Sequence, residues 1–166
     1  FLVMSFDDGA GRMVLKDDRL WVNWPAAGRQ PVFIRVNEAL FDATRPLGGT
    51  YVANPTWNKL LGHDLVTVHP LGGCVMAERA ENGVVDHAGR VFAGTTGAEV
   101  HPGLAVLDGA IIPMPLGVNP LLTIAALAER NCSLLAEENG WQIDSVAQPA
   151  VAPKAAAPLQ PGIRFT

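Results

Sequence analysis

Short apolar runs separated by turn residues open the chain, and this pattern predicts β-strands. Residues 1–6, 13–16 and 20–24 are mostly apolar, and clusters of Asp and Gly lie between them at 7–11 and 17–18. Asp and Gly at such positions are typical of hairpin turns, so we expect an antiparallel meander. The pattern then changes, because apolar residues recur at helical spacing from Val32 to Phe41. This spacing predicts a helix that ends near Pro46.

The second half of the chain begins with loops and ends with a long helix. Residues 50–103 are rich in Gly, Pro and Asn, which predicts loops with short strands such as 65–68, and we interpret His101-Pro102 as loop. A compact apolar strand is expected at 104–107. Asn119-Pro120 is a helix start signal, 121–138 holds no helix breaker, and Asn139-Gly140 is a stop signal. The first half of this helix is apolar almost all round, so we expect burial on most sides.

The composition excludes several classes of protein. The chain has 166 residues, 49% of them hydrophobic, with 12 basic and 16 acidic side chains and a net charge of −4. That is enough apolar material for one domain or a large part of one. No apolar run is long enough to span a membrane, and no basic cluster points to nucleic acid or an anionic membrane. Two cysteines form neither a disulfide framework nor a zinc site, and His63 and His87 lack a second ligand at metal spacing.

Three short blocks contain the residues that could carry chemistry. They are Val68-His69-Pro70-Leu71-Gly72-Gly73-Cys74, then Leu107-Asp108-Gly109-Ala110-Ile111-Ile112-Pro113, then Gly117-Val118-Asn119-Pro120 leading into Thr123 and Ala128-Glu129-Arg130-Asn131. Taken singly, each block has an ordinary structural interpretation: a loop histidine, a turn aspartate, a helix cap or a tight glycine bend. Their order along one chain is what makes them informative.

In this order the blocks resemble the C-terminal signature of the glucose-methanol-choline (GMC) family of FAD-dependent oxidoreductases, in particular its cholesterol oxidase branch. The resemblance also includes 18–24 and 37–41, and covers the chain from residue 1 to about residue 140. It implies a mixed α/β fold that is the C-terminal fragment of a two-domain flavoprotein. Residues 1–102 would belong to the antiparallel sheet and helix of the substrate-binding domain. Residues 103–144 would supply the last strand and helix of a Rossmann-like FAD domain, and 145–166 an Ala/Pro-rich linker or tail.

The same resemblance implies roles for individual residues. His69 is implied as the active-site histidine that helps to remove the substrate's hydroxyl proton, and Asn119 as its partner. Contact with the flavin cofactor is implied for Asp108, Gly109, Asn119, Pro120, Leu121, Gly72 and Gly73. Elementary chemistry agrees, because histidine titrates near neutral pH and can accept that proton. The N-terminus of the 121–138 helix carries partial positive charge, which suits the negative charge of a reduced flavin.

The sequence therefore predicts the C-terminal portion of an FAD-dependent alcohol oxidoreductase acting on a bulky apolar secondary alcohol, such as a 3-hydroxysteroid. The chain contains no Gly-x-Gly-x-x-Gly turn, so the phosphate-binding part of the FAD site is expected in the rest of the same polypeptide. Two alternatives remain open. One is a non-catalytic module, derived from the family, that binds an apolar ligand or a partner chain. The other is a GMC oxidoreductase of a non-steroid alcohol. Retention of His69, Asn119 and Asp108-Gly109 favours an enzyme.

Overall fold

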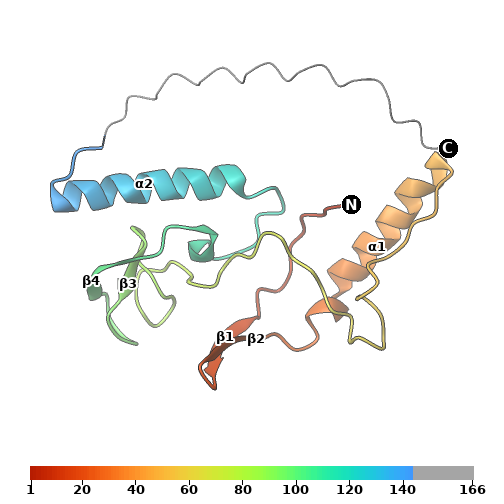
Figure 1. The fold of residues 1–166 in the computed structure, drawn as a ribbon, viewed down its shortest axis with the longest axis horizontal. Helices are drawn as coiled ribbons and strands as arrows, with labels where there is room; N and C mark the ends of the chain where they lie inside the picture. The colour runs from red at the N-terminus through yellow and green to blue at the C-terminus, as the bar shows by residue number, and fades with distance from the viewer. Residues whose placement is uncertain (144–166) are drawn as a thin grey trace, which may run out of the picture.

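The computed structural model describes residues 1–143, which form two small antiparallel sheets and two long helices (Figure 1). In chain order the elements are β1 (Arg12–Lys16), β2 (Arg19–Asn23), the 3-10 helix η1 (Ala27–Arg29), α1 (Pro31–Thr44), the 3-10 helix η2 (Arg45–Leu47), β3 (Arg90–Phe92), β4 (Val100–Ala105), the 3-10 helix η3 (Gly109–Ile111) and α2 (Leu121–Asn139). The predicted mixture of helix and antiparallel sheet is confirmed. No helix in this described part is both long and apolar enough to cross a bilayer.

The hairpin of β1 and β2 forms where the Asp/Gly pattern predicted a turn. Asp17 and Asp18 have φ values of 51° and 54°, and two successive left-handed residues match the twist of a tight hairpin. The strand predicted at residues 1–6 is wrong, because residues 1–11 join no ladder. Instead of pairing, this segment lays the Phe6 ring against Gly117, where there is no room for a side chain. All ten residues of the hairpin strands are exposed.

Helix α1 confirms the helix that the apolar spacing from Val32 to Phe41 predicted. It begins at Pro31, whose fixed φ suits a first helical position, and continues into η2. Gly48, at φ 66°, ends that turn. The loop that follows packs back beside η1, where the Trp57 indole N–H donates to the Gly28 carbonyl oxygen at 2.7 Å. The strand predicted at 65–68 does not form.

The hydrophobic core lies in the second half of the chain. Val85, Ile111 and Ile112 are at most 2% exposed, and the partly buried residues around them are Leu71, Cys74, Met76, Val91, Val106, Leu116, Ile124 and Leu127. Beside this core, β3 pairs with β4 in antiparallel fashion across an irregular register. The strand predicted at 104–107 begins earlier, at Val100, and ends at Ala105. His101 and Pro102 therefore lie inside a strand and not in the predicted loop.

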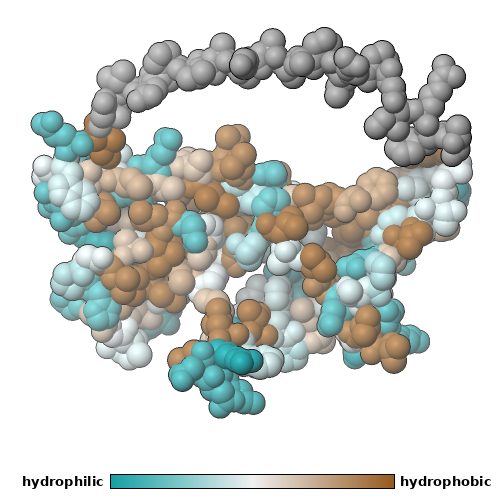
Figure 2. Space-filling view, in the orientation of Figure 1, coloured by the Kyte–Doolittle hydropathy of each residue, from teal (hydrophilic) through white to brown (hydrophobic). Residues whose placement is uncertain are grey.

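Helix α2 has nearly the predicted bounds, and Gly140 at φ 66° ends it. Pro120 takes the N-cap position, one residue later than predicted, and the Asn119 Oδ1 accepts from the Leu121 N–H at 3.0 Å. The prediction that the first half of this helix is buried on most sides is wrong for residues 1–143. Leu121 and Leu122 are 67% and 81% exposed, because only the side that carries Ile124 faces the core. Figure 2 shows hydrophobic surface over this helix.

Candidate functional site

The first two sequence blocks run side by side in the structure. The Cys74 N–H donates to the Ala110 carbonyl oxygen at 2.9 Å, and the Met76 N–H donates to the Ile111 carbonyl oxygen at 2.9 Å. These backbone bonds join segments more than thirty positions apart in the sequence. Cys74 is half-buried against the core, as a small apolar residue would be.

Two glycines form the bend of the first block. Gly72 has φ 77°, a left-handed conformation that glycine adopts without strain, and a Cβ there would lie 3.5 Å from the Ile112 carbonyl oxygen. A Cβ on Gly73 would lie 3.1 Å from the Met13 methyl carbon. The bend therefore packs against the second block on one side and against the β1–β2 hairpin on the other.

All three blocks meet at Gly109. A Cβ on this buried glycine would lie 3.0 Å from Ile124 Cδ1 of α2 and 3.1 Å from Leu71 Cδ2 of the first block. The preceding residue, Asp108, is exposed, and its Oδ1 accepts from the Ala110 N–H at 2.8 Å, which caps η3. The blocks that the sequence analysis selected are therefore neighbours in space.

His69 lies just before the glycine bend and is half-buried. Its backbone N–H donates to the Thr67 hydroxyl at 3.3 Å. The ring nitrogen Nδ1 is buried and has no hydrogen-bond partner among the described residues. Buried polar atoms are nearly always paired in native proteins, and the unpaired state of this nitrogen is shared by His63 Nδ1. No hydrogen bond within residues 1–143 joins His69 to Asn119.

The start of α2 places hydrogen-bond donors beside exposed apolar side chains. The Asn119 Oδ1 is used by the helix, which leaves its amide N–H groups as donors on an exposed side chain. Pro120 is buried and anchors the turn, whereas Leu121 and Leu122 are exposed. The first N–H groups of a helix lie outside its own hydrogen-bond ladder and carry partial positive charge. These donors beside apolar side chains fit a flat, largely apolar ring system with an electron-rich edge.

A polar cluster that the sequence analysis missed ties α2 to β3. Arg90 bonds Asp86 Oδ2 through Nη2 at 2.6 Å and Nε at 2.8 Å, and its Nη1 lies 3.1 Å from Glu138 Oε1. Burial alone raises the pKa of Asp86, but hydrogen bonds from Arg90 and Ala88 outweigh it and hold the pKa below its ordinary value. The same hydrogen bond to Asp86 raises the pKa of Arg90. The only signal in the sequence was an Asp and an Arg four residues apart around a glycine.

A second polar contact lies about two helical turns before Glu138. Arg130 Nη1 donates to the His87 carbonyl oxygen at 2.8 Å and to Asn131 Oδ1 at 2.9 Å. Asn131 is only 1% exposed, and its Nδ2 has no partner among the described residues. Both polar contacts hold the 86–90 turn against the C-terminal half of α2.

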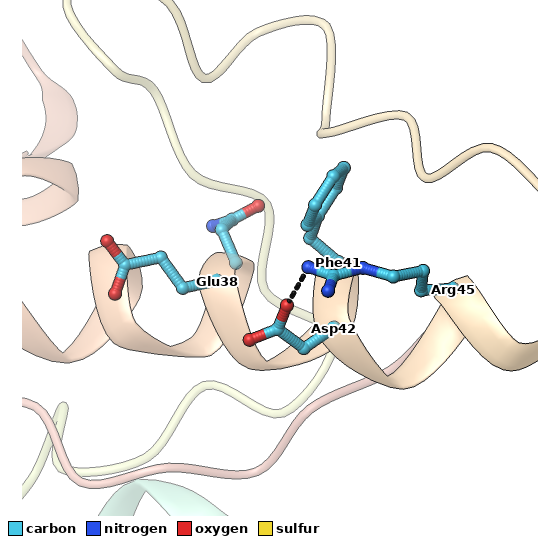
Figure 3. A pocket seen from close by; sticks show the side chains of 5 residues that line it. Glu38, Phe41, Asp42 and Arg45 are labelled. Atoms are coloured by element: carbon cyan, nitrogen blue, oxygen red, sulfur yellow. Dashed lines mark hydrogen bonds and ion pairs between the residues drawn. The ribbon is translucent and has the colours of Figure 1, made fainter.

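Two hollows of the surface are lined by residues outside these blocks, although the second includes Val66, two residues before the first block. One of about 460 Å³ lies beside α1 and is lined by Asn37, Glu38, Phe41, Asp42 and Arg45 (Figure 3). A second, of about 430 Å³, lies between the N-terminal segment, α1 and residues 50–54. Nowhere in residues 1–143 do three potential metal-ligating side chains come together. The candidate site is the surface built from the three blocks.

Comparison with known proteins gives independent matches. A family model described as GMC oxidoreductase matches residues 30–128. A cholesterol oxidase of Mycobacterium tuberculosis (strain H37Rv) is 36% identical over 80% of this chain and 22% of its own length. A cholesterol oxidase of Acinetobacter baumannii is 36% identical over 81% of this chain and 24% of its own length. A long-chain-alcohol oxidase of Arabidopsis thaliana is 33% identical over 55% of this chain and 11% of its own length. The chain thus spans less than a quarter of these relatives, and no solved structure matches it significantly.

Proposed function

The chain belongs to the GMC oxidoreductase family, and from this premise we propose that it supplies the C-terminal active-site segment of an FAD-dependent alcohol oxidoreductase. The observation that carries the proposal is the convergence of the three blocks at Gly109. The contacts of Leu71 and Ile124 at Gly109 hold the glycine-bend segment, the Asp108-Gly109 turn and the first turn of α2 against one another, as an active site assembled from these segments requires. The division into substrate-domain residues 1–102, FAD-domain residues 103–144 and a tail at 145–166 is part of this proposal. The tail lies outside the described residues.

The residues of this chain would hold one side of the FAD. Asn119, Pro120 and Leu121 would lie against the ring system, and Asp108, Gly109, Gly72 and Gly73 would border the cofactor nearby. When bound, FAD supplies the acceptor for the hydride that leaves the carbinol carbon. The partial positive charge at the α2 N-terminus stabilises negative charge on that acceptor without reorganisation, because its N–H groups are already oriented.

His69 and Asn119 would act on the substrate hydroxyl. The imidazole accepts the hydroxyl proton, which leaves the oxygen as the carbonyl forms. The half-buried position of the His69 ring restricts its rotation and protects the transfer from bulk water. The Asn119 amide N–H, free of the helix cap, donates to the substrate oxygen and orients it.

We propose a bulky apolar secondary alcohol, such as a 3-hydroxysteroid, as the substrate. The likeness to two cholesterol oxidases supports this substrate class. The likeness to a long-chain-alcohol oxidase supports the second candidate, which is a non-steroid alcohol. Exposed Val66 and Val68 next to His69, together with Leu122, provide apolar surface for either substrate.

The test is an anaerobic visible absorption spectrum of the full-length polypeptide that carries this segment, before and after addition of a 3β-hydroxysteroid or a long-chain primary alcohol. Flavin bands that bleach with the steroid support the whole proposal. Bleaching with the primary alcohol alone keeps the oxidoreductase and refutes the steroid. Absence of a flavin band, even after addition of FAD, refutes the enzyme and favours the binding module.

Substitution of His69→Gln then tests the proton acceptor. We expect kcat to fall by about 10²- to 10⁴-fold, the usual contribution of a positioned general base, while the flavin spectrum stays unchanged. His101→Gln is the matched control, because His101 is exposed on β4 and belongs to none of the three blocks. Equal rates in the two variants would contradict the role of His69.

A further inference from the structure

We propose that Asn131 is a positioning residue, which sets the register of α2 against the segment leading to Asp108 and so places the α2 N-terminus at the flavin. This inference rests on the proposed function. Asn131 is not among the residues proposed to contact substrate or cofactor. It carries a polar side chain on the face of α2 that meets the hydrophobic core.

Asn131 occupies a position where an apolar side chain is the ordinary choice. It follows Leu127 by four residues and Ile124 by seven, so all three share the face of α2 that meets the core. Asn131 is 1% exposed, whereas its neighbours Arg130 and Cys132 are exposed. Burial of an amide costs free energy unless both its ends are paired. A leucine would fill the space at no such cost, which indicates a role other than stability.

The surroundings of Asn131 connect α2 to two other segments. Its Oδ1 accepts from Arg130, whose guanidinium also donates to the His87 carbonyl oxygen in the 86–90 turn. Its Nδ2 lies 3.2 Å from the position of a Cβ built on Gly89, and the Val106 carbonyl oxygen would clash with that same Cβ. The amide donor and the carbonyl acceptor therefore border one small space, which exists because Gly89 has no side chain.

This arrangement fixes one register of the helix. Apolar contacts tolerate small slides of one element along another, whereas the chain of bonds from Asn131 Oδ1 through the Arg130 guanidinium to the His87 carbonyl oxygen is directional. Val106 lies two residues before Asp108, and its N–H donates to the Gly89 carbonyl oxygen at 2.8 Å, so the 86–90 turn that Arg130 contacts is bonded to the approach to the second block. Leu121 lies ten residues before Asn131 on one uninterrupted helix, about 15 Å away at 1.5 Å per residue. Because the helix is continuous, a shift of α2 along its axis at Asn131 moves its flavin-facing N-terminus by the same distance.

The experiment compares two asparagine substitutions on the same helix in the full-length flavoprotein. Asn131→Leu keeps the branched outline of the side chain and puts two methyl groups in place of the amide oxygen and nitrogen, so it removes the acceptor for Arg130. Asn139→Leu is the matched control, because the Asn139 amide is exposed and donates only to the Leu135 carbonyl oxygen of its own helix. We expect Asn131→Leu to melt no lower than wild type, to shift the flavin absorption bands and to weaken FAD binding. We expect kcat to fall about 100-fold with little change in KM, as for a displacement of about 1 Å in an active site.

The outcomes separate the two proposals. A wild-type protein without flavin refutes the proposed function before any variant is made. A folded Asn131→Leu protein with wild-type FAD affinity, spectrum and kcat overturns the positioning role alone. If Asn131→Leu does not fold, Asn131→Ala decides, because it removes the acceptor for Arg130 and adds neither bulk nor charge. Weakened FAD binding in a folded Asn131→Ala supports the proposal, and unchanged binding overturns it.

Discussion

Removal of the Asp86 carboxylate should destabilise the protein strongly, because this group is nearly buried and both of its oxygens accept hydrogen bonds. Its side chain is 11% exposed and accepts from the backbone N–H groups of Ala88 and Arg90 and from two nitrogens of the Arg90 guanidinium. Breaking a buried ion pair by deleting one partner costs about 3–5 kcal/mol. The Arg90 side chain is 34% exposed and keeps Glu138, so we expect Asp86→Ala to fall near the lower limit, about 3 kcal/mol.

Urea unfolding followed by circular dichroism at 222 nm measures this loss. Asp86→Asn should cost less, about 1.5 kcal/mol, because the amide keeps an acceptor for the two backbone N–H groups and loses the charge. Asp42→Ala is the control, since its ion pair with Arg45 is short, at 2.6 Å, but about 70% exposed on both side chains, and should contribute less than about 1 kcal/mol. An Asp86→Ala protein no less stable than Asp42→Ala would refute the argument that burial makes this cluster important.

Two further predictions follow from the same region. The pKa of Asp86 is lower in the folded than in the unfolded state, so its contribution to stability is complete above the ordinary aspartate pKa of about 3.9 and is lost as the pH falls through the folded value. Urea midpoints from pH 7 to pH 3 should fall more steeply in wild type than in Asp86→Asn, and equal slopes would contradict this. Gly89→Ala should lose about 3 kcal/mol in the same assay, because φ is 79° and the new Cβ would clash with the Val106 carbonyl oxygen. Gly48→Ala, with φ 66° but open space, should lose only about 1 kcal/mol.

Local signals in the sequence predicted the local structure well. Asp17-Asp18 predicted a hairpin turn, the apolar spacing predicted α1, and Asn119 to Gly140 delimited α2 to within one or two residues. Each of these features depends on residues that are close in sequence. The meeting of the three blocks was expected only through the resemblance to a family, since no local pattern indicates that Leu71 and Ile124 both contact Gly109.

The features that sequence analysis missed depend on distant partners. Residues 1–6 have strand composition, but a strand exists only with a neighbour to complete its ladder. The helix start at Leu121 and Leu122 is apolar all round, but burial requires other elements on each side. Arg90 meets Glu138 across 48 positions, and Asn131 is buried within a helical stretch that looks polar in sequence. In each case the structure depends on which distant segment packs against the residue, and the local composition of the sequence does not determine that.

The β1–β2 hairpin restricts what can dock beside it. Within residues 1–143 no third strand pairs with it, so the outer edge of each strand presents a row of free N–H and carbonyl groups. A two-stranded ribbon is marginal in water alone. Apolar side chains such as Leu15, Leu20 and Val22 stand on the same hairpin with more than half of their surface exposed. A neighbouring element that offered only an apolar surface would leave the N–H and carbonyl groups of these edge strands without hydrogen-bond partners. An extended segment would satisfy both features, because its backbone can pair with the edge groups while its side chains cover the apolar ones.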